Sequence, residues 1–164
     1  MAKGRASTGT PATTLLTREK VAYTAHTYEL GDTTLSYGEA VAEALGVEPE
    51  RMFKTLVATV DGRLAVGVVP VAGSLDLKAL AMALDGKRGA MAEPAAAERA
   101  TGYVTGGISP IGQRTRLPIV VDESASKWET VFVSGGRRGL QIELAPADLV
   151  RVAGATLAPI ASSN

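Results

Sequence analysis

Hydrophobic residues recur along the chain with two periods, which predict an alternation of short helices and strands. Apolar positions at helical spacing follow capping residues or proline and stop at glycine. Runs rich in β-branched residues, bounded by glycine, proline or charge, are typical of strands. These patterns predict helices over residues 11–20, 36–46, 75–84, 94–99 and 146–154, and strands over residues 22–29, 55–60, 64–69, 90–92, 119–122, 130–133 and 140–144.

Two local signals are especially specific. Ser36, with Glu39 three residues later, forms a capping-box pattern, and the apolar face behind it stops at Gly46. Asp61-Gly62 separates two β-branched runs and suits the left-handed backbone of a tight hairpin. The chain has neither an internal repeat nor strict β-α-β alternation. We therefore expect a single α+β domain with a mixed, curved sheet and peripheral helices.

The composition narrows the classes of function. The 17 lysines and arginines balance 17 aspartates and glutamates, so the strong electrostatic pull of a non-specific nucleic-acid binder is missing. Any contact with RNA should be local or assisted by a partner. The absence of cysteine excludes disulfides, zinc–thiolate sites and a cysteine nucleophile.

The ends of the chain and its hydropathy suggest where the domain lies. Residues 1–9 are polar and rich in glycine, which predicts a disordered leader and not a signal peptide. Residues 10–161 are expected to form the domain. No apolar run approaches the roughly 18 residues needed to span a bilayer. These features predict a soluble, cytoplasmic protein.

Familiar catalytic and cofactor motifs are missing. His26 is the single histidine, and no G-x-S-x-G elbow surrounds a serine, which disfavours a Ser-His-Asp triad. The glycines match neither a phosphate-binding Walker loop nor a dinucleotide fingerprint. One histidine also disfavours catalytic zinc. We expect no metal and no cofactor.

The remaining candidates leave alternatives open. Lys54 begins an apolar strand, so its amine either extends into water or enters a cleft to hold a phosphate, a ribose oxygen or a developing oxyanion. His26 and Tyr28 share one strand face, in a structural or a binding role. Residues 101–118 form either a flexible connector or a glycine loop that approaches a ligand. Residues 134–139 form either a plain hairpin turn or a turn whose arginines contact phosphate.

Several motifs, taken in order, resemble the YbaK/EbsC family of bacterial deacylases that clear mischarged tRNA. That family is related to the editing domain inserted in prolyl-tRNA synthetases. The resemblance spans nearly the whole chain after the leader. Its motifs are Gly9-Thr10-Pro11-Ala12, His26-Thr27-Tyr28, Phe53-Lys54-Thr55-Leu56, Leu75-Asp76-Leu77-Lys78, Thr101-Gly102-Tyr103, Gly106-Gly107-Ile108-Ser109-Pro110 and Val133-Ser134-Gly135-Gly136.

The resemblance implies both a fold and a site. The fold would be that of the YbaK and prolyl-tRNA synthetase-associated domains, with a partly barrel-like sheet. Lys54 would be the residue most closely tied to activity. Tyr37 stands where the family pattern leads us to expect phenylalanine. The residues implied in substrate binding are Tyr28, Tyr37, Thr55, Gly106, Gly107, Ile108, Pro110 and Ser134.

The resemblance also implies a reaction. The expected substrate is Cys-tRNA(Pro), with Cys-tRNA(Cys) as a second candidate, and prolyl-tRNA synthetase is the expected partner. The cysteine thiol would attack its own ester, while Lys54 and the Gly106-Gly107 backbone donate to the oxyanion. This mechanism agrees with a chain that has no nucleophile of its own. The alternatives are a deacylase for Ala-tRNA(Pro) or another small amino acid, and a non-catalytic module that binds tRNA or the synthetase.

Overall fold

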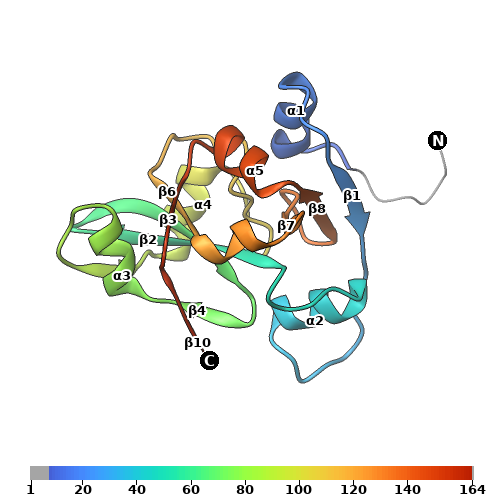
Figure 1. The fold of residues 1–164 in the computed structure, drawn as a ribbon, viewed down its shortest axis with the longest axis horizontal. Coiled ribbons are helices and arrows are strands. Elements are labelled where there is room, and N and C mark those ends of the chain that lie inside the picture. Colours follow the sequence, from blue (N-terminus) through green and yellow to red (C-terminus); the bar gives the residue numbers. More distant parts are fainter. Residues whose placement is uncertain (1–7, 164) are drawn as a thin grey trace.

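The computed structural model describes residues 8–163, and its helices and strands follow the predicted order along the chain (Figure 1). Most of the leader expected over residues 1–9 lies outside the described residues. The α-helices are α1 (Pro11–Arg18), α2 (Tyr37–Leu45), α3 (Leu77–Ala83), α4 (Pro94–Thr101) and α5 (Pro146–Ala153), joined by a 3-10 helix, η1 (Glu123–Lys127). The strands are β1 (Thr24–Thr27), β2 (Phe53–Val60), β3 (Arg63–Pro70), β4 (Gly73–Leu75), β5 (Gly89–Met91), β6 (Ile119–Asp122), β7 (Val131–Ser134), β8 (Leu140–Leu144), β9 (Thr156–Ala158) and β10 (Ala161–Ser163).

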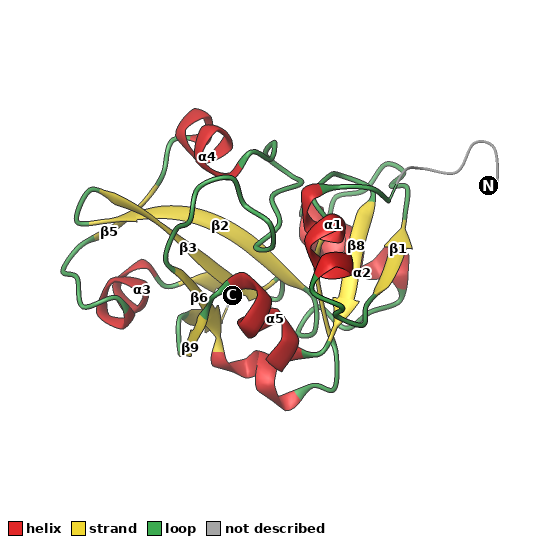
Figure 2. Cartoon of the chain, turned by 90° about the horizontal axis from the view of Figure 1, so that it is seen from above, coloured by secondary structure: helices red, strands yellow, loops and turns green. Residues whose placement is uncertain are grey.

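The strands form three sheets. A five-stranded mixed sheet has the order β5-β2-β3-β6-β9, in which β3, β6 and β9 run parallel. A three-stranded antiparallel sheet has the order β1-β8-β7, and β4 pairs with β10. Figure 2 shows β1 and β8 set apart from the five-stranded sheet. These arrangements confirm the predicted α+β class with a mixed sheet, although the sheets of the described residues do not close into a barrel.

The two specific local signals are confirmed. Asp61 and Gly62 adopt φ angles of 52° and 84°, the left-handed conformation of a tight turn between β2 and β3. The Ser36 hydroxyl accepts a hydrogen bond from the Glu39 amide, and α2 ends at a left-handed Gly46.

The segment around α3 differs from its prediction, which began the helix at Leu75. Leu75 instead lies in β4, opposite Ala161 of β10, and the Asp76 carboxylate caps α3 by accepting from the Ala79 amide at 3.0 Å. Sequence patterns did not reveal β9, β10 or η1. The pairing partners of these short strands lie far away in sequence, so local periodicity carries little trace of them.

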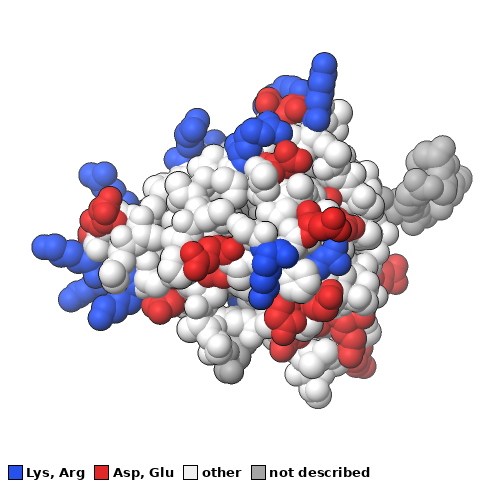
Figure 3. Space-filling view, viewed as in Figure 1, with Lys and Arg blue, Asp and Glu red and all other residues white. Residues whose placement is uncertain are grey.

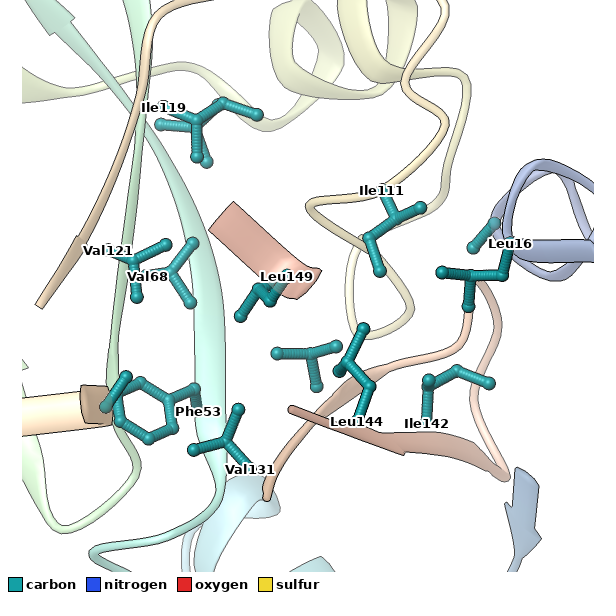
Figure 4. Close-up of a cluster of buried hydrophobic side chains, with 14 of the residues drawn as sticks. Leu16, Phe53, Val68, Ile111, Ile119, Val121, Val131, Ile142, Leu144 and Leu149 are labelled. Carbon is teal, nitrogen blue, oxygen red and sulfur yellow. The ribbon is translucent and has the colours of Figure 1, made fainter. Parts of the chain in front are cut away.

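One large hydrophobic cluster joins the two main sheets (Figure 4). Val68 and Val121 of the five-stranded sheet pack in the same cluster as Ile142 of β8, Leu16 of α1 and Leu149 of α5. An isolated parallel bridge between Met52 and Phe132 also links the sheets. The start of β2 is thereby held between the two sheets, where the candidate site forms.

Candidate functional site

A pocket of about 360 Å³ opens where β2 begins. Its walls come from the first turn of α2, the start of β2, the segment leading into α4, the loop after α4, and the β7–β8 hairpin. Elements from both main sheets therefore build one cavity. The lining residues are Ser36, Tyr37, Gly38, Val41, Met52, Phe53, Lys54, Thr55, Leu56, Val57, Val71, Met91, Ala92, Pro94, Ala97, Thr105, Gly106, Ile108, Ser134 and Gln141.

Lys54 supplies the one charged side chain among these lining residues. It follows the buried Phe53 and pairs with Val69 across the β2–β3 ladder, so the hairpin fixes its backbone. Burial lowers the pKa of the Lys54 ammonium below its usual 10.5, and the charge of Glu39 partly offsets this shift. Among the described residues, no carboxylate lies within ion-pair distance of the Lys54 amine. The ammonium is therefore available to a ligand.

Two tyrosines meet at the α2 side of the pocket. The hydroxyl of Tyr37, a lining residue, hydrogen-bonds the hydroxyl of Tyr28 at 2.5 Å. Tyr28 is not itself a lining residue and reaches the pocket through this contact. Burial and the Tyr28 hydrogen bond both raise the pKa of Tyr37, so its phenol stays neutral. The guanidinium of Arg138 lies over the Tyr37 ring, 4.7 Å from its centroid.

The glycine loop contributes only part of its sequence to the pocket. Gly106 and Ile108 line it, whereas Gly107 packs against the β7–β8 turn, where an added Cβ would lie 2.7 Å from the Arg137 Cα. The Gly107 amide donates to the Val104 carbonyl at 2.9 Å, so it is already used within the protein. The Gly106 amide has no hydrogen-bond partner among the described residues. Pro110 lies outside the pocket, in a second groove.

Gln141 was not among the residues expected to form the site. It alternates with Glu143 along β8, a pattern that on sequence favours a solvent-facing position. In the structure only 6% of Gln141 is exposed, and its Oε1 is buried without a hydrogen-bond partner. The Oγ1 of Thr55, an expected site residue, is buried and unpartnered in the same way. Both residues line the pocket, and each keeps one buried oxygen without a partner among the described residues.

His26 belongs to a different cluster. Its Nε2 lies 2.9 Å from Glu143, which also accepts from Arg51 and Thr130. The hydrogen bond from Thr130 is the main cause of the lowered pKa of Glu143, followed by the contacts with His26 and Arg51. His26 is not a lining residue of the pocket, so this geometry favours the structural alternative.

Ser134 joins the β7–β8 turn to the pocket. It lines the cavity, and its hydroxyl accepts a hydrogen bond from the Gly136 amide at 3.1 Å. The described residues contain no cluster of three or more histidine, cysteine, aspartate or glutamate side chains able to hold a metal. No helix among them is both long and apolar enough to cross a membrane.

Comparison with known proteins connects this pocket to a family. A family model described as an aminoacyl-tRNA editing domain matches residues 33–152. The chain belongs to this family. The match spans the pocket from Ser36 to Gln141 and confirms the expectation of an enzyme that acts on aminoacyl-tRNA.

Individual relatives of this editing domain agree in sequence and in fold. The chain is 38% identical, over the full length of both proteins, to EbsC of Enterococcus faecalis. EbsC is named as a candidate Cys-tRNA(Pro)/Cys-tRNA(Cys) deacylase. This similarity confirms the resemblance to the YbaK/EbsC family. A solved structure described as a candidate trans-editing enzyme for prolyl-tRNA synthetase has a TM-score of 0.78 at 24% identity. The match covers 93% of this chain and 96% of the solved chain. The structure of hypothetical protein APE2540 has a TM-score of 0.80 at 24% identity, and the match covers 93% of this chain and 100% of that one. At these identities the two structures establish the shared fold.

Proposed function

We propose that this editing domain removes cysteine from mischarged Cys-tRNA(Pro), with Cys-tRNA(Cys) as a second substrate, and that the substrate thiol performs the attack. The observation that carries the proposal is the chemistry of the pocket wall. It holds one ammonium, several hydroxyls and an amide, but no histidine, cysteine, aspartate or glutamate among its lining residues. Such a wall can bind and orient an ester, yet it offers no base to activate a hydroxyl as a nucleophile.

The cysteine side chain supplies the missing nucleophile. Its thiol loses a proton, and the sulfur attacks the ester carbonyl carbon of the same residue. The resulting oxyanion collapses by breaking the bond to the ribose oxygen, which takes up a proton as the tRNA leaves. The product is a cyclic thioester, which water opens to free cysteine. Intramolecular attack in a well-oriented geometry is worth about 7–11 kcal/mol of the barrier.

Two groups in the pocket are suited to the oxyanion. The Lys54 ammonium has no carboxylate partner, and the Gly106 amide has no hydrogen-bond partner among the described residues. A charged donor in a partly apolar pocket stabilises developing negative charge more strongly than it would in water. The Gly107 amide, bound to the Val104 carbonyl, has no part in this proposal.

A relative supports the choice of cysteine, and the charge of the chain supports the choice of a partner. The similarity to EbsC extends over both whole chains, and the name of EbsC specifies cysteine. We infer that prolyl-tRNA synthetase presents the mischarged tRNA, because a chain with balanced charge lacks the general pull that would capture tRNA unaided. This activity belongs in the cytoplasm, where translation takes place.

The test compares three substrates that share one tRNA. Labelled Cys-tRNA(Pro), Ser-tRNA(Pro) and Ala-tRNA(Pro) are incubated with the protein, with and without prolyl-tRNA synthetase, and amino-acid release is followed. Thiol-dependent chemistry predicts release of cysteine at least about a hundredfold faster than serine, which differs only by oxygen in place of sulfur. Equal release of alanine would contradict the mechanism. Binding to the synthetase without turnover of any substrate would identify a non-catalytic module.

A further inference from the structure

Charge is unevenly distributed around the pocket although the whole chain is balanced. Residues 29–50 contain six acidic residues and neither lysine nor arginine, and they include α2, whose first turn lines the pocket. Figure 3 shows acidic side chains gathered over α2. Residues 99–118 contain three arginines and neither aspartate nor glutamate, and they include the loop that lines another wall. The acidic residues of this segment repel a polyanion, whereas Arg138 lies over Tyr37 at the start of α2 and attracts one.

Two glycines of the loop each accommodate an arginine side chain. At Gly106, where φ is +92°, an added Cβ would lie 2.4 Å from the Arg138 Nε. At Gly102, where φ is +81°, it would lie 3.3 Å from the Arg114 Cβ and 3.5 Å from its Nε. Both arginines are exposed, and neither has a carboxylate partner among the described residues. These glycines therefore leave room for two cationic side chains against the loop.

The position of Arg138 is well suited to phosphate. Its guanidinium stacks on the Tyr37 ring, which leaves its N–H groups around the edge free to donate. Tyr37 and Gly106 both line the pocket, so Arg138 stands at its rim. An arginine whose orientation is already restricted by stacking loses less entropy when it binds a phosphate bidentately.

The two glycines that Arg138 and Arg114 pack against lie within the length of a short single strand. Gly102 and Gly106 are four residues apart, so their Cα atoms are separated by at most about 14 Å. At about 3.4 Å per stacked nucleotide, this distance covers no more than about four nucleotides. The single-stranded 3′ end of a tRNA has this scale, and its last nucleotide is joined to the ester in the pocket.

We propose that the 3′ end of the tRNA leaves the pocket over Arg138, beside Tyr37 at the start of α2, and continues past Gly102 to Arg114 in the second groove, so that both arginines bind phosphates of its terminal nucleotides. This inference rests on the proposed function, because it assumes that the pocket receives an aminoacyl ester of RNA. It assigns an RNA-binding role to two residues that no family motif singled out.

The test measures RNA binding apart from chemistry. Wild type, Arg138→Gln and Arg114→Gln are titrated against a fluorescent, uncharged minihelix RNA ending in a single-stranded 3′ ACCA, and anisotropy is recorded between 50 and 200 mM KCl. Arg63→Gln is the matched control, because Arg63 is exposed and pairs with Val60 at the far end of β2 from Lys54, roughly 20 Å along the strand. Each test variant should weaken binding about tenfold at the lowest salt. Each should also reduce the slope of log affinity against log salt by about 0.7.

The possible results separate the two proposals. RNA affinity and salt slope at the wild-type level in both test variants would overturn the inference, as would an equal loss in Arg63→Gln. If Arg138 acts only by shaping the pocket through Tyr37, Arg138→Gln will slow deacylation without weakening RNA binding, which also overturns it. A wild-type protein that binds the minihelix but releases no amino acid defeats the proposed function and leaves the RNA path supported.

Discussion

The hydroxyl groups of Tyr28 and Tyr37 hydrogen-bond to each other at 2.5 Å, so the segment after β1 is tied to the first turn of α2 at the pocket wall. Tyr37 lines the pocket, and Tyr28 does not. The two residues thus share one bond but have different access to a substrate. Comparing variants of the two tyrosines therefore distinguishes a structural from a functional role of the Tyr37 hydroxyl.

Replacing each tyrosine by phenylalanine distinguishes these roles. Tyr28→Phe and Tyr37→Phe should each lower the free energy of unfolding by about 1 kcal/mol, because each leaves one hydroxyl without its partner. The double variant should lose less stability than the sum of the two single losses, because neither hydroxyl is then left without its partner. Urea unfolding of the four proteins measures these differences. Additive losses would show that the two hydroxyls do not stabilise each other.

The same pair tests selection of the amino acid. Of the two tyrosines only Tyr37 lines the pocket, so we expect only Tyr37→Phe to remove a hydroxyl that a serine side chain would meet. The preference for Cys-tRNA over Ser-tRNA, measured as a ratio of kcat/KM, should rise about fivefold in Tyr37→Phe, equivalent to about 1 kcal/mol. Tyr28→Phe is the control and should leave the ratio near that of wild type. An equal change in both variants would assign the effect to the lost bond.

Lys54→Met removes the ammonium and keeps much of the side-chain volume. Loss of one oxyanion donor should lower kcat by about 10² to 10³. The melting temperature should not fall, because burial disfavours the Lys54 charge, as its lowered pKa indicates. Single-turnover deacylation and thermal melts check both outcomes. Lys78→Met, at an exposed position of α3, is the matched control, and a similar kcat in the two variants would exclude Lys54 as the donor.

The pH dependence of deacylation reports on the same ammonium. The proposed mechanism needs Lys54 protonated, so kcat/KM should fall as pH rises through a pKa below 10.5. Lys54→Arg keeps its charge at higher pH, so the falling limb of its kcat/KM profile should move to higher pH even if its rate is lower. Rates are measured on Cys-tRNA after subtraction of spontaneous hydrolysis. Identical falling limbs in wild type and Lys54→Arg would assign that titration to another group.

Glu143 should make folding depend on pH. Its pKa is lowered in the folded protein, first by the Thr130 hydrogen bond and then by His26 and Arg51. The stability that Glu143 contributes is therefore fully present above the pKa of the unfolded chain, near 4.5. It is lost as pH falls through the lowered pKa of the folded protein. Glu143→Gln should lose about 1 kcal/mol at pH 7 and show a weaker decline in stability between pH 5 and pH 3. Glu129→Gln, at an exposed position, serves as the control, and unfolding curves that decline alike in wild type and Glu143→Gln would contradict this role.

The sequence by itself determined the local elements and the family. Caps such as Ser36, the Asp61-Gly62 turn and the β-branched runs act through interactions between near neighbours, which a pattern can record. Ordered motifs around Lys54, Gly106 and Ser134 sufficed to predict the editing family, which the comparisons confirmed.

Only the tertiary structure decided how those residues meet. Packing between the two sheets buried Gln141 in the pocket although its alternation favoured solvent. It also set the Arg138 side chain against Gly106, which is distant in sequence, and over Tyr37 at the start of α2. These relationships depend on contacts between residues far apart in the chain, and no local periodicity encodes them.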